Sequence, residues 1–117
     1  MKLQEDLVAM ERKLWTGGSP DYRETLDTDC LIAFREMAGV SSRDSIAAQA
    51  DARHWRNPKI DVEGFLQPTD DVAILTYQAS AQRETGEAYR ARVSSGYVKR
   101  GAGWKMMFHA QTPREAA

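Results

Sequence analysis

Few residues in this chain have the types and spacing that catalysis requires. Its 117 residues include one cysteine, Cys30, and two histidines, His54 and His109. A catalytic thiol needs a neighbouring base, and a free cysteine is more often a small buried residue of the core. The histidines show no HxH or ExxH spacing of the kind that zinc sites use. The sequence therefore predicts no metal site, no cofactor and no evident nucleophile.

The aromatic residues offer a second kind of site, a pocket for a small molecule. Pockets combine apolar walls with a few convergent polar groups, whereas aromatic side chains also dominate ordinary cores. Both interpretations stay open at this point. His109 or Gln111 would add polar groups to a pocket. The side chains that we expect to line it are Trp15, Tyr22, Phe34, Trp55, Leu75, Tyr77, Ser95, Tyr97, Trp104 and Phe108.

Three helices are predicted in the first half of the chain. Apolar residues recur at helical spacing from Leu3 to Leu14 and predict an amphipathic helix that ends at Gly17. Ser19, followed by a proline, is a typical start of a second helix. An S-x-x-D pattern predicts a third helix over about residues 42–52.

Strands dominate the rest of the chain. The apolar run CLIAF at 30–34 predicts a short strand, and Asn57 before Pro58 predicts a connector. From Lys59 onward the apolar residues alternate with period two. We expect strands over about 60–66, 72–83, 88–100 and 104–112.

Strand parity assigns side chains to the two faces of this sheet. In the last strand Trp104 and Phe108 belong to the more apolar set, which is expected to face the helices. His109 and Gln111 then fall on the convex face, where a partner subunit would sit, unless a bulge reverses the strand end. The strand 72–83 is apolar on both faces near its middle, as in a sheet covered on both sides. Leu75 and Tyr77 share one face of this strand, and in the next strand the set expected to face inward includes Ser95 and Tyr97.

The charge balance argues against two classes of partner. With 16 basic and 17 acidic residues the net charge is −1, so no basic excess is available for nucleic acid or for a membrane surface. No apolar run approaches the roughly 18 residues that cross a bilayer, and the N-terminal stretch lacks the apolar region of a signal peptide. We therefore expect one domain, residues 1–117, in the cytoplasm.

Several local patterns point to one family. They are DDVAILTYQA at 70–79, YRARVSSGYVKR at 89–100 and HAQTP at 109–113, together with Glu11 and Trp15 in the first helix. These patterns and the order of the elements resemble the NTF2-like superfamily, in its SnoaL-like or DUF4440 branch. The resemblance implies an α+β cone, with three N-terminal helices on a curved, mixed, mainly antiparallel sheet. It also implies a pocket inside the cone and a homodimer through the convex sheet face.

The resemblance also bears on particular residues. Relatives of the isomerase type carry a carboxylate base near the positions of Asp27 and Asp29, although aspartates that end a helix are more often caps or solvated turn residues. No acidic residue lies mid-strand on the inward face of the last two strands, where a protonated donor would be needed. Many relatives have a polar residue directly after the last histidine, where this chain has Ala110.

Three functions remain open, because the superfamily hosts very different activities. The first is a homodimer that binds a small apolar or aromatic molecule in the cone without catalysis. The second is an enzyme of the SnoaL or ketosteroid-isomerase type, an isomerase or cyclase that uses Asp27 or Asp29 with Tyr77 or Tyr97. The third is a non-enzymatic assembly module whose cone is filled. A carboxylate inside the cone would favour the second, and a packed interior the third.

Overall fold

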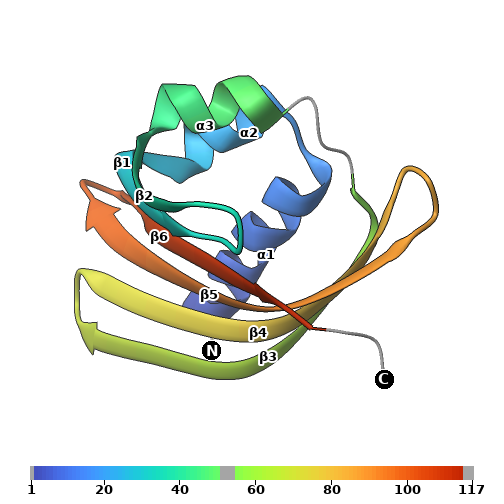
Figure 1. Cartoon of the computed structure of the whole chain (residues 1–117). Helices are drawn as coiled ribbons and strands as arrows, with labels where there is room; N and C mark the ends of the chain where they lie inside the picture. Colours follow the sequence, from blue (N-terminus) through green and yellow to red (C-terminus); the bar gives the residue numbers. More distant parts are fainter. Residues whose placement is uncertain (1, 51–54, 115–117) are drawn as a thin grey trace.

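Three helices cover the concave face of a curved six-stranded sheet in the computed structural model, which describes residues 2–50 and 55–114 (Figure 1). The elements are α1 (Lys2–Thr16), α2 (Ser19–Thr25), β1 (Leu26–Ala33), β2 (Ala38–Ser42), α3 (Arg43–Ala50), β3 (Trp55–Thr69), β4 (Val72–Arg83), β5 (Ala88–Arg100) and β6 (Gly103–Pro113). The strand order is β2-β1-β6-β5-β4-β3, and all neighbours are antiparallel except β1 and β6. The predicted fold class, an α+β cone with a mixed sheet, is confirmed, and the sheet does not close.

The first helix crosses the concave face and supplies its central apolar stripe. Leu7, Leu14 and Trp15 are buried against the sheet, as their helical spacing predicts. Each such side chain contributes about 1.5–3 kcal/mol through burial. Glu11 lies within the same stripe and is equally buried. None of the helices among the described residues is long and apolar enough to span a membrane.

The strands near α2 and α3 differ from the prediction. The strand expected at 30–34 begins four residues earlier, at Leu26, so Asp27 and Asp29 lie in β1 rather than in a turn. Gly39, with φ of 141°, belongs to a further strand, β2, that pairs with β1 and was not predicted. The third helix ends at Ala50, and the rest of its predicted span falls outside the described residues.

The third strand is longer than its alternation suggests. β3 includes Asn57 and Pro58, which were predicted to form a connector, and it continues through Pro68, beyond the predicted end near residue 66. Asn57 has φ of 52° at an irregularity in the pairing with β4. β3 is an edge strand, so a proline can face away from its neighbour without losing a ladder hydrogen bond.

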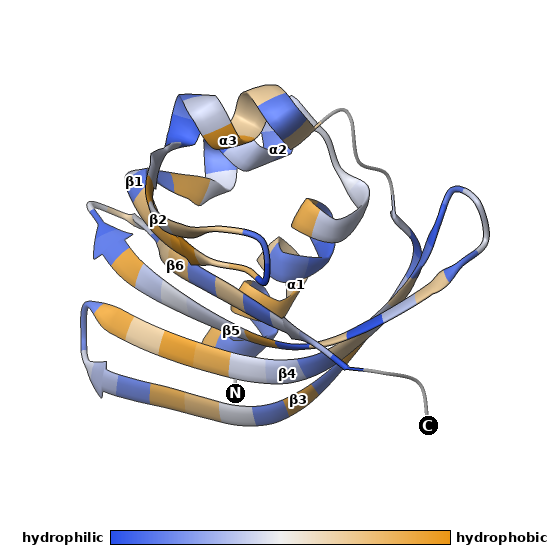
Figure 2. Cartoon of the chain, viewed as in Figure 1, coloured by the Kyte–Doolittle hydropathy of each residue, from blue (hydrophilic) through white to orange (hydrophobic). Residues whose placement is uncertain are grey.

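The faces of β4 and β5 follow the predicted parity. Leu75, Tyr77, Ser95 and Tyr97 are fully buried beneath the helices. Ile74 on the other face is 41% exposed. Figure 2 shows consecutive apolar residues near the start of β4, and consecutive residues of a strand point to opposite faces.

The last strand departs from simple alternation because it contains a bulge. Gly96 of β5 pairs with Phe108, whereas the next residue, Tyr97, pairs with Met106, which leaves Met107 as an extra residue in β6. An extra residue reverses the parity beyond it. The assignment of His109 to the convex face was therefore wrong: its side chain lies on the concave side, and that of Phe108 on the convex side.

Candidate functional site

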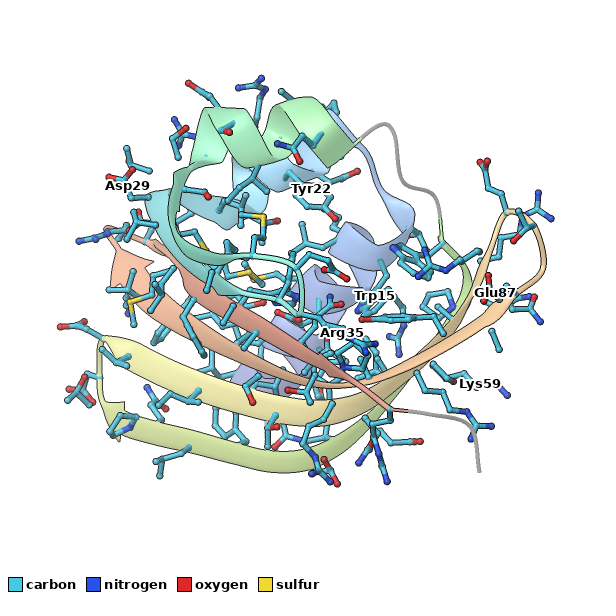
Figure 3. The ribbon with its side chains drawn as sticks, in the orientation of Figure 1. Trp15, Tyr22, Asp29, Arg35, Lys59 and Glu87 are labelled. Carbon is cyan, nitrogen blue, oxygen red and sulfur yellow. The ribbon has the colours of Figure 1, made fainter. Side chains whose placement is uncertain are left out.

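A cavity of about 710 Å³ lies between the helices and the sheet. This volume falls within the range of roughly 300–1,000 Å³ that small-molecule sites occupy. Trp15 and Tyr22 lie at the inner side of the space between helices and sheet, and Arg35 lies near the turn between β1 and β2 (Figure 3). The apolar walls include Leu14, Trp15, Phe34, Ile46, Trp55 and Met106, and the polar lining includes Glu11, Gln49, Tyr89, His109 and Gln111.

At the inner end of the cavity lies the buried carboxylate of Glu11, which is 1% exposed. It accepts hydrogen bonds from Tyr77 Oη at 2.5 Å, from Ser95 Oγ at 3.1 Å, and from the hydroxyl of Tyr97. The indole of Trp15 donates to the Tyr77 hydroxyl at 3.0 Å. Desolvating a carboxylate costs several kcal/mol, and hydrogen bonds to a charged acceptor offset this cost. The three hydroxyl groups therefore form a preorganised site for one negative charge.

A chain of hydrogen bonds joins this carboxylate to the cavity wall. Ser95 Oγ lies 2.8 Å from Nδ1 of His109, and Nε2 of the same ring lies 3.0 Å from Nε2 of Gln111. The hydroxyl of Tyr89 donates to Gln111 Oε1 at 2.8 Å. The ring thus lies between the buried serine and the amide, and an edge contact with Phe34, at 5.8 Å between centroids, fixes its orientation.

Burial determines the protonation of these groups. Desolvation lowers the pKa of His109, an effect that the nearby Glu11 carboxylate partly opposes. The contact of 3.8 Å between Glu11 and Nδ1 is therefore one between a carboxylate and a neutral imidazole. Burial and the neighbouring negative charge raise the pKa values of Tyr77 and Tyr97, so both hydroxyls remain donors.

The residues that the sequence nominated for a pocket fall into three groups. Those along the cavity are Trp15, Tyr22, Phe34, Trp55, His109 and Gln111. Those buried in the core beneath it are Leu75, Tyr77, Ser95 and Tyr97. Trp104 packs against the core at the other end of β6. Phe108 and Ala110 lie on the convex face because of the bulge, so the alanine removes no polar group from the cavity.

The two aspartates considered as catalytic bases lie outside the cavity. Asp27 accepts two hydrogen bonds from the guanidinium of Arg100, at 2.8 and 3.3 Å, and this pairing lowers the pKa of its carboxyl. Asp29 is exposed at the outer edge of β1 (Figure 3). The hypothesis that either residue acts as a base inside the cone is wrong, because β1 turns both toward the outside.

The residue that sequence reasoning missed is Glu11. Its signal was available, because a charged residue at a position between Leu7 and Leu14 interrupts the apolar stripe of α1. A buried carboxylate requires several donors. The candidate donors lie 66 to 86 residues away along the chain, on β4 and β5, and the sequence alone does not pair them with Glu11.

The described residues offer little for a metal or a thiol mechanism. Within 2–50 and 55–114 no group of three His, Cys, Asp or Glu side chains is placed to hold a metal ion. His54 lies outside the described residues. Cys30 is buried, and desolvation raises the pKa of its thiol to about 12, so the thiolate that a nucleophile requires is not formed at neutral pH.

The fold is shared with solved structures of low sequence identity. No family model and no curated protein matches the sequence. An NTF2-like protein of unknown function from Prochlorococcus sp. NATL2A superposes with a TM-score of 0.82 at 12% identity, over 100% of this chain and 97% of that one. An NTF-2 like protein of unknown function from Silicibacter pomeroyi DSS-3 gives 0.71 at 14% identity, over 95% and 92%.

A third structure carries a more specific description. It is a candidate Ca/calmodulin-dependent kinase II association domain from Exiguobacterium sibiricum 255-15, with a TM-score of 0.73 and 19% identity over 98% of this chain and 92% of that one. At such identities the likeness is one of fold. The chain has the NTF2-like fold.

Proposed function

We propose that the protein binds a small apolar or aromatic molecule in the cavity, as a cytoplasmic member of the SnoaL-like or DUF4440 branch of the NTF2-like superfamily. The observation that carries this proposal is the cavity itself, with a volume of about 710 Å³ and aromatic walls that include Trp15, Trp55 and Phe34. A core that served only for packing would be filled to crystal-like density. The fixed polar groups at the inner end provide the few oriented contacts that ligand sites use.

Native mass spectrometry of the freshly purified protein tests this proposal. A retained molecule that is released by denaturing extraction, and whose body is apolar or aromatic, is the expected result. Refilling the stripped protein with the same compound should restore the mass shift at one molecule per chain. A retained compound that is wholly polar or highly charged would contradict the proposed ligand class.

A homodimer through the convex sheet face completes the proposal. Residues paired across all six strands form an apolar row on this face: Val40, Leu31, Phe108, Gly96, Ile74 and Leu66. Val40 is 72% exposed, Leu31 48% and Leu66 60%. Contiguous exposed apolar surface of this kind is typical of a protein–protein interface.

A second candidate function is acid–base catalysis of the isomerase or cyclase type. It is favoured by Glu11, a carboxylate inside the cone, and by His109, which connects it to the cavity. Exchange of ligand protons in heavy water, measured by NMR on the compound retained by the protein, tests it. Exchange that depends on His109 would support catalysis, and its absence would leave binding alone. The third function, an assembly module, is suggested by the description of the Exiguobacterium structure, and a hollow cone supports it less.

A further inference from the structure

Each hydrogen bond between Glu11, Ser95 and His109 has a defined donor and acceptor. The hydroxyl of Ser95 donates its only proton to Glu11 across 3.1 Å. The same oxygen lies 2.8 Å from Nδ1 of His109. Since its proton is already used, Ser95 can only accept in this second bond. Nδ1 of His109 therefore carries a hydrogen and donates it.

The other ring nitrogen is then the acceptor. The side chain of His109 is 12% exposed, and burial keeps the ring neutral, with one hydrogen. That hydrogen is on Nδ1, so the lone pair of the ring is on Nε2. The amide of Gln111 donates to Nε2 at 3.0 Å, and its oxygen accepts from Tyr89 at 2.8 Å. All the bonds of the chain run in one direction, from the cavity toward the carboxylate.

The charge of the Glu11 carboxylate acts in the same direction as these hydrogen bonds. The Glu11 carboxylate lies 3.8 Å behind the ring, and in a low-dielectric interior its field favours donors and disfavours anions on the cavity side. Two cations belong to the same lining: Arg35 is exposed, and Arg83 lies over the rings of Trp55 and Tyr89, with its guanidinium carbon 4.9 and 5.4 Å from their centroids. On the wall formed by β6, the acceptor nitrogen thus belongs to a ring that has a carboxylate behind it.

We infer that the ligand of the cavity presents an O–H or N–H donor to Nε2 of His109, in place of the Gln111 amide. This rests on the proposed function, because it assigns the ligand class of the same cavity. The ligand is then an apolar or aromatic molecule with one hydroxyl or amine group, and neither a carboxylate nor a pure hydrocarbon. A ligand hydroxyl can donate to Nε2 and accept from the displaced Gln111 amide, whereas an analogue that displaces the amide without a donor leaves Nε2 unpaired.

A matched pair of probes isolates the donor. 2-Naphthol and 2-methoxynaphthalene share an aromatic body, and only the first has an O–H group. Titration of the purified, ligand-free protein with each compound gives two dissociation constants. We expect 2-naphthol to bind more tightly by about five- to tenfold, the ratio that one net hydrogen bond supports.

Two variants assign the preference to the ring. His109→Phe keeps an aromatic ring and removes the acceptor, so the preference for 2-naphthol should fall to about onefold. Thr112→Val changes an exposed polar residue of the same strand that does not line the cavity, and it should leave the preference unchanged. Circular dichroism confirms that each variant is folded. Should His109→Phe fail to fold, nitrogen-15 NMR of the wild-type histidines, assigned with a His54→Asn variant, reports directly on Nε2.

The outcomes separate this inference from the proposed function. Equal binding of the two probes to the wild-type protein, or a hydrogen on Nε2 of the free protein, would overturn the inference and leave the proposed function standing. Binding of neither probe would overturn both. A preference that disappears in His109→Phe and persists in Thr112→Val would support it.

Discussion

At the scale of single residues, Glu11 determines the character of the site. Its carboxylate is buried in the apolar stripe of α1 and satisfied by hydroxyl groups from two strands. A glutamine in its place would turn an amide N–H₂ toward groups that are themselves donors. The loss of charge would also leave the hydroxyls with a weaker acceptor.

We predict that Glu11→Gln lowers the free energy of unfolding by about 1–3 kcal/mol, the cost of leaving buried polar groups unsatisfied. Urea denaturation followed by circular dichroism measures the change. Glu5→Gln is the matched control, because Glu5 lies exposed on the same helix, and it should change the stability by less than about 0.5 kcal/mol. Equal effects of the two variants would show that the carboxylate is not needed by the network.

His109 should make stability depend on pH. The unfolded chain takes up a proton on this residue near its ordinary pKa of 6.5, whereas burial lowers the pKa in the folded state. Below about pH 6.5 the unfolded state therefore binds more protons, and the free energy of unfolding falls as the pH falls. We predict a smaller fall over this range in His109→Phe, measured by urea denaturation at several pH values. Parallel pH profiles for both proteins would contradict the burial of a neutral ring.

The aromatic residues show which part of the site could not be predicted from the sequence. The aromatic set was predicted as either core or pocket, and the structure divides it: Trp15, Tyr22 and Trp55 line the cavity, whereas Tyr77 and Tyr97 hold Glu11 beneath it. The division depends on how deep each side chain lies in the cone. Depth is set by sheet curvature and by strand register, and neither has a local signal in the sequence.

At the scale of elements, the bulge in β6 decides what the cavity contains. Strand parity correctly assigned the inward face of β5, because its pairing with β4 is regular from Val72↔Val98 to Gln82↔Ala88. Parity failed in β6 because Met107 is an extra residue there. A bulge is favoured by close contacts across strands rather than by residue type, so the alternation of β6 alone gave no warning.

Gly96 of β5, which pairs with Phe108, leaves room for the bulge in β6. A Cβ atom at this position would lie 3.2 Å from Cβ of Phe108 and 3.7 Å from Cε of Met107. We predict that Gly96→Val lowers the free energy of unfolding by about 1–3 kcal/mol through overpacking, even though valine normally favours strands. Ser94→Val, on the same face of the same strand, should cost less. A neutral Gly96→Val in chemical denaturation would show that Phe108 has room to move.

At the scale of the whole molecule, the order of the elements predicted the fold through its resemblance to a known superfamily. An amphipathic helix, two short helices and a long terminal meander resemble the NTF2-like order, which implies an α+β cone, and the structure confirms that fold class. The parallel pairing of β1 with β6 was not predictable from alternation, because it joins segments about 77 residues apart. This pairing closes one side of the cavity, so the cavity depends on contacts between segments that are far apart in the sequence.

The proposed dimer is also tested at this scale. Ile74, 41% exposed on the convex face, should be buried by a partner, so Ile74→Asp should weaken self-association by roughly tenfold or more. Met37→Asp is the control, since Met37 is 48% exposed at the cavity lining and not on the convex face. Light scattering after size exclusion measures the masses against 13.2 kDa for one chain. A wild-type protein that is monomeric at high concentration would contradict the dimer.

Titration with N-phenyl-1-naphthylamine, whose fluorescence rises in apolar surroundings, tests most directly whether the cavity is a binding site. The wild-type protein should bind it saturably at one molecule per chain. Ile46→Trp, which fills the cavity from α3, should abolish the signal, and Ala48→Trp, on the exposed side of the same helix, should preserve it. Absence of saturable binding to the wild-type protein, or equal binding to Ile46→Trp, would contradict a ligand site inside the cone.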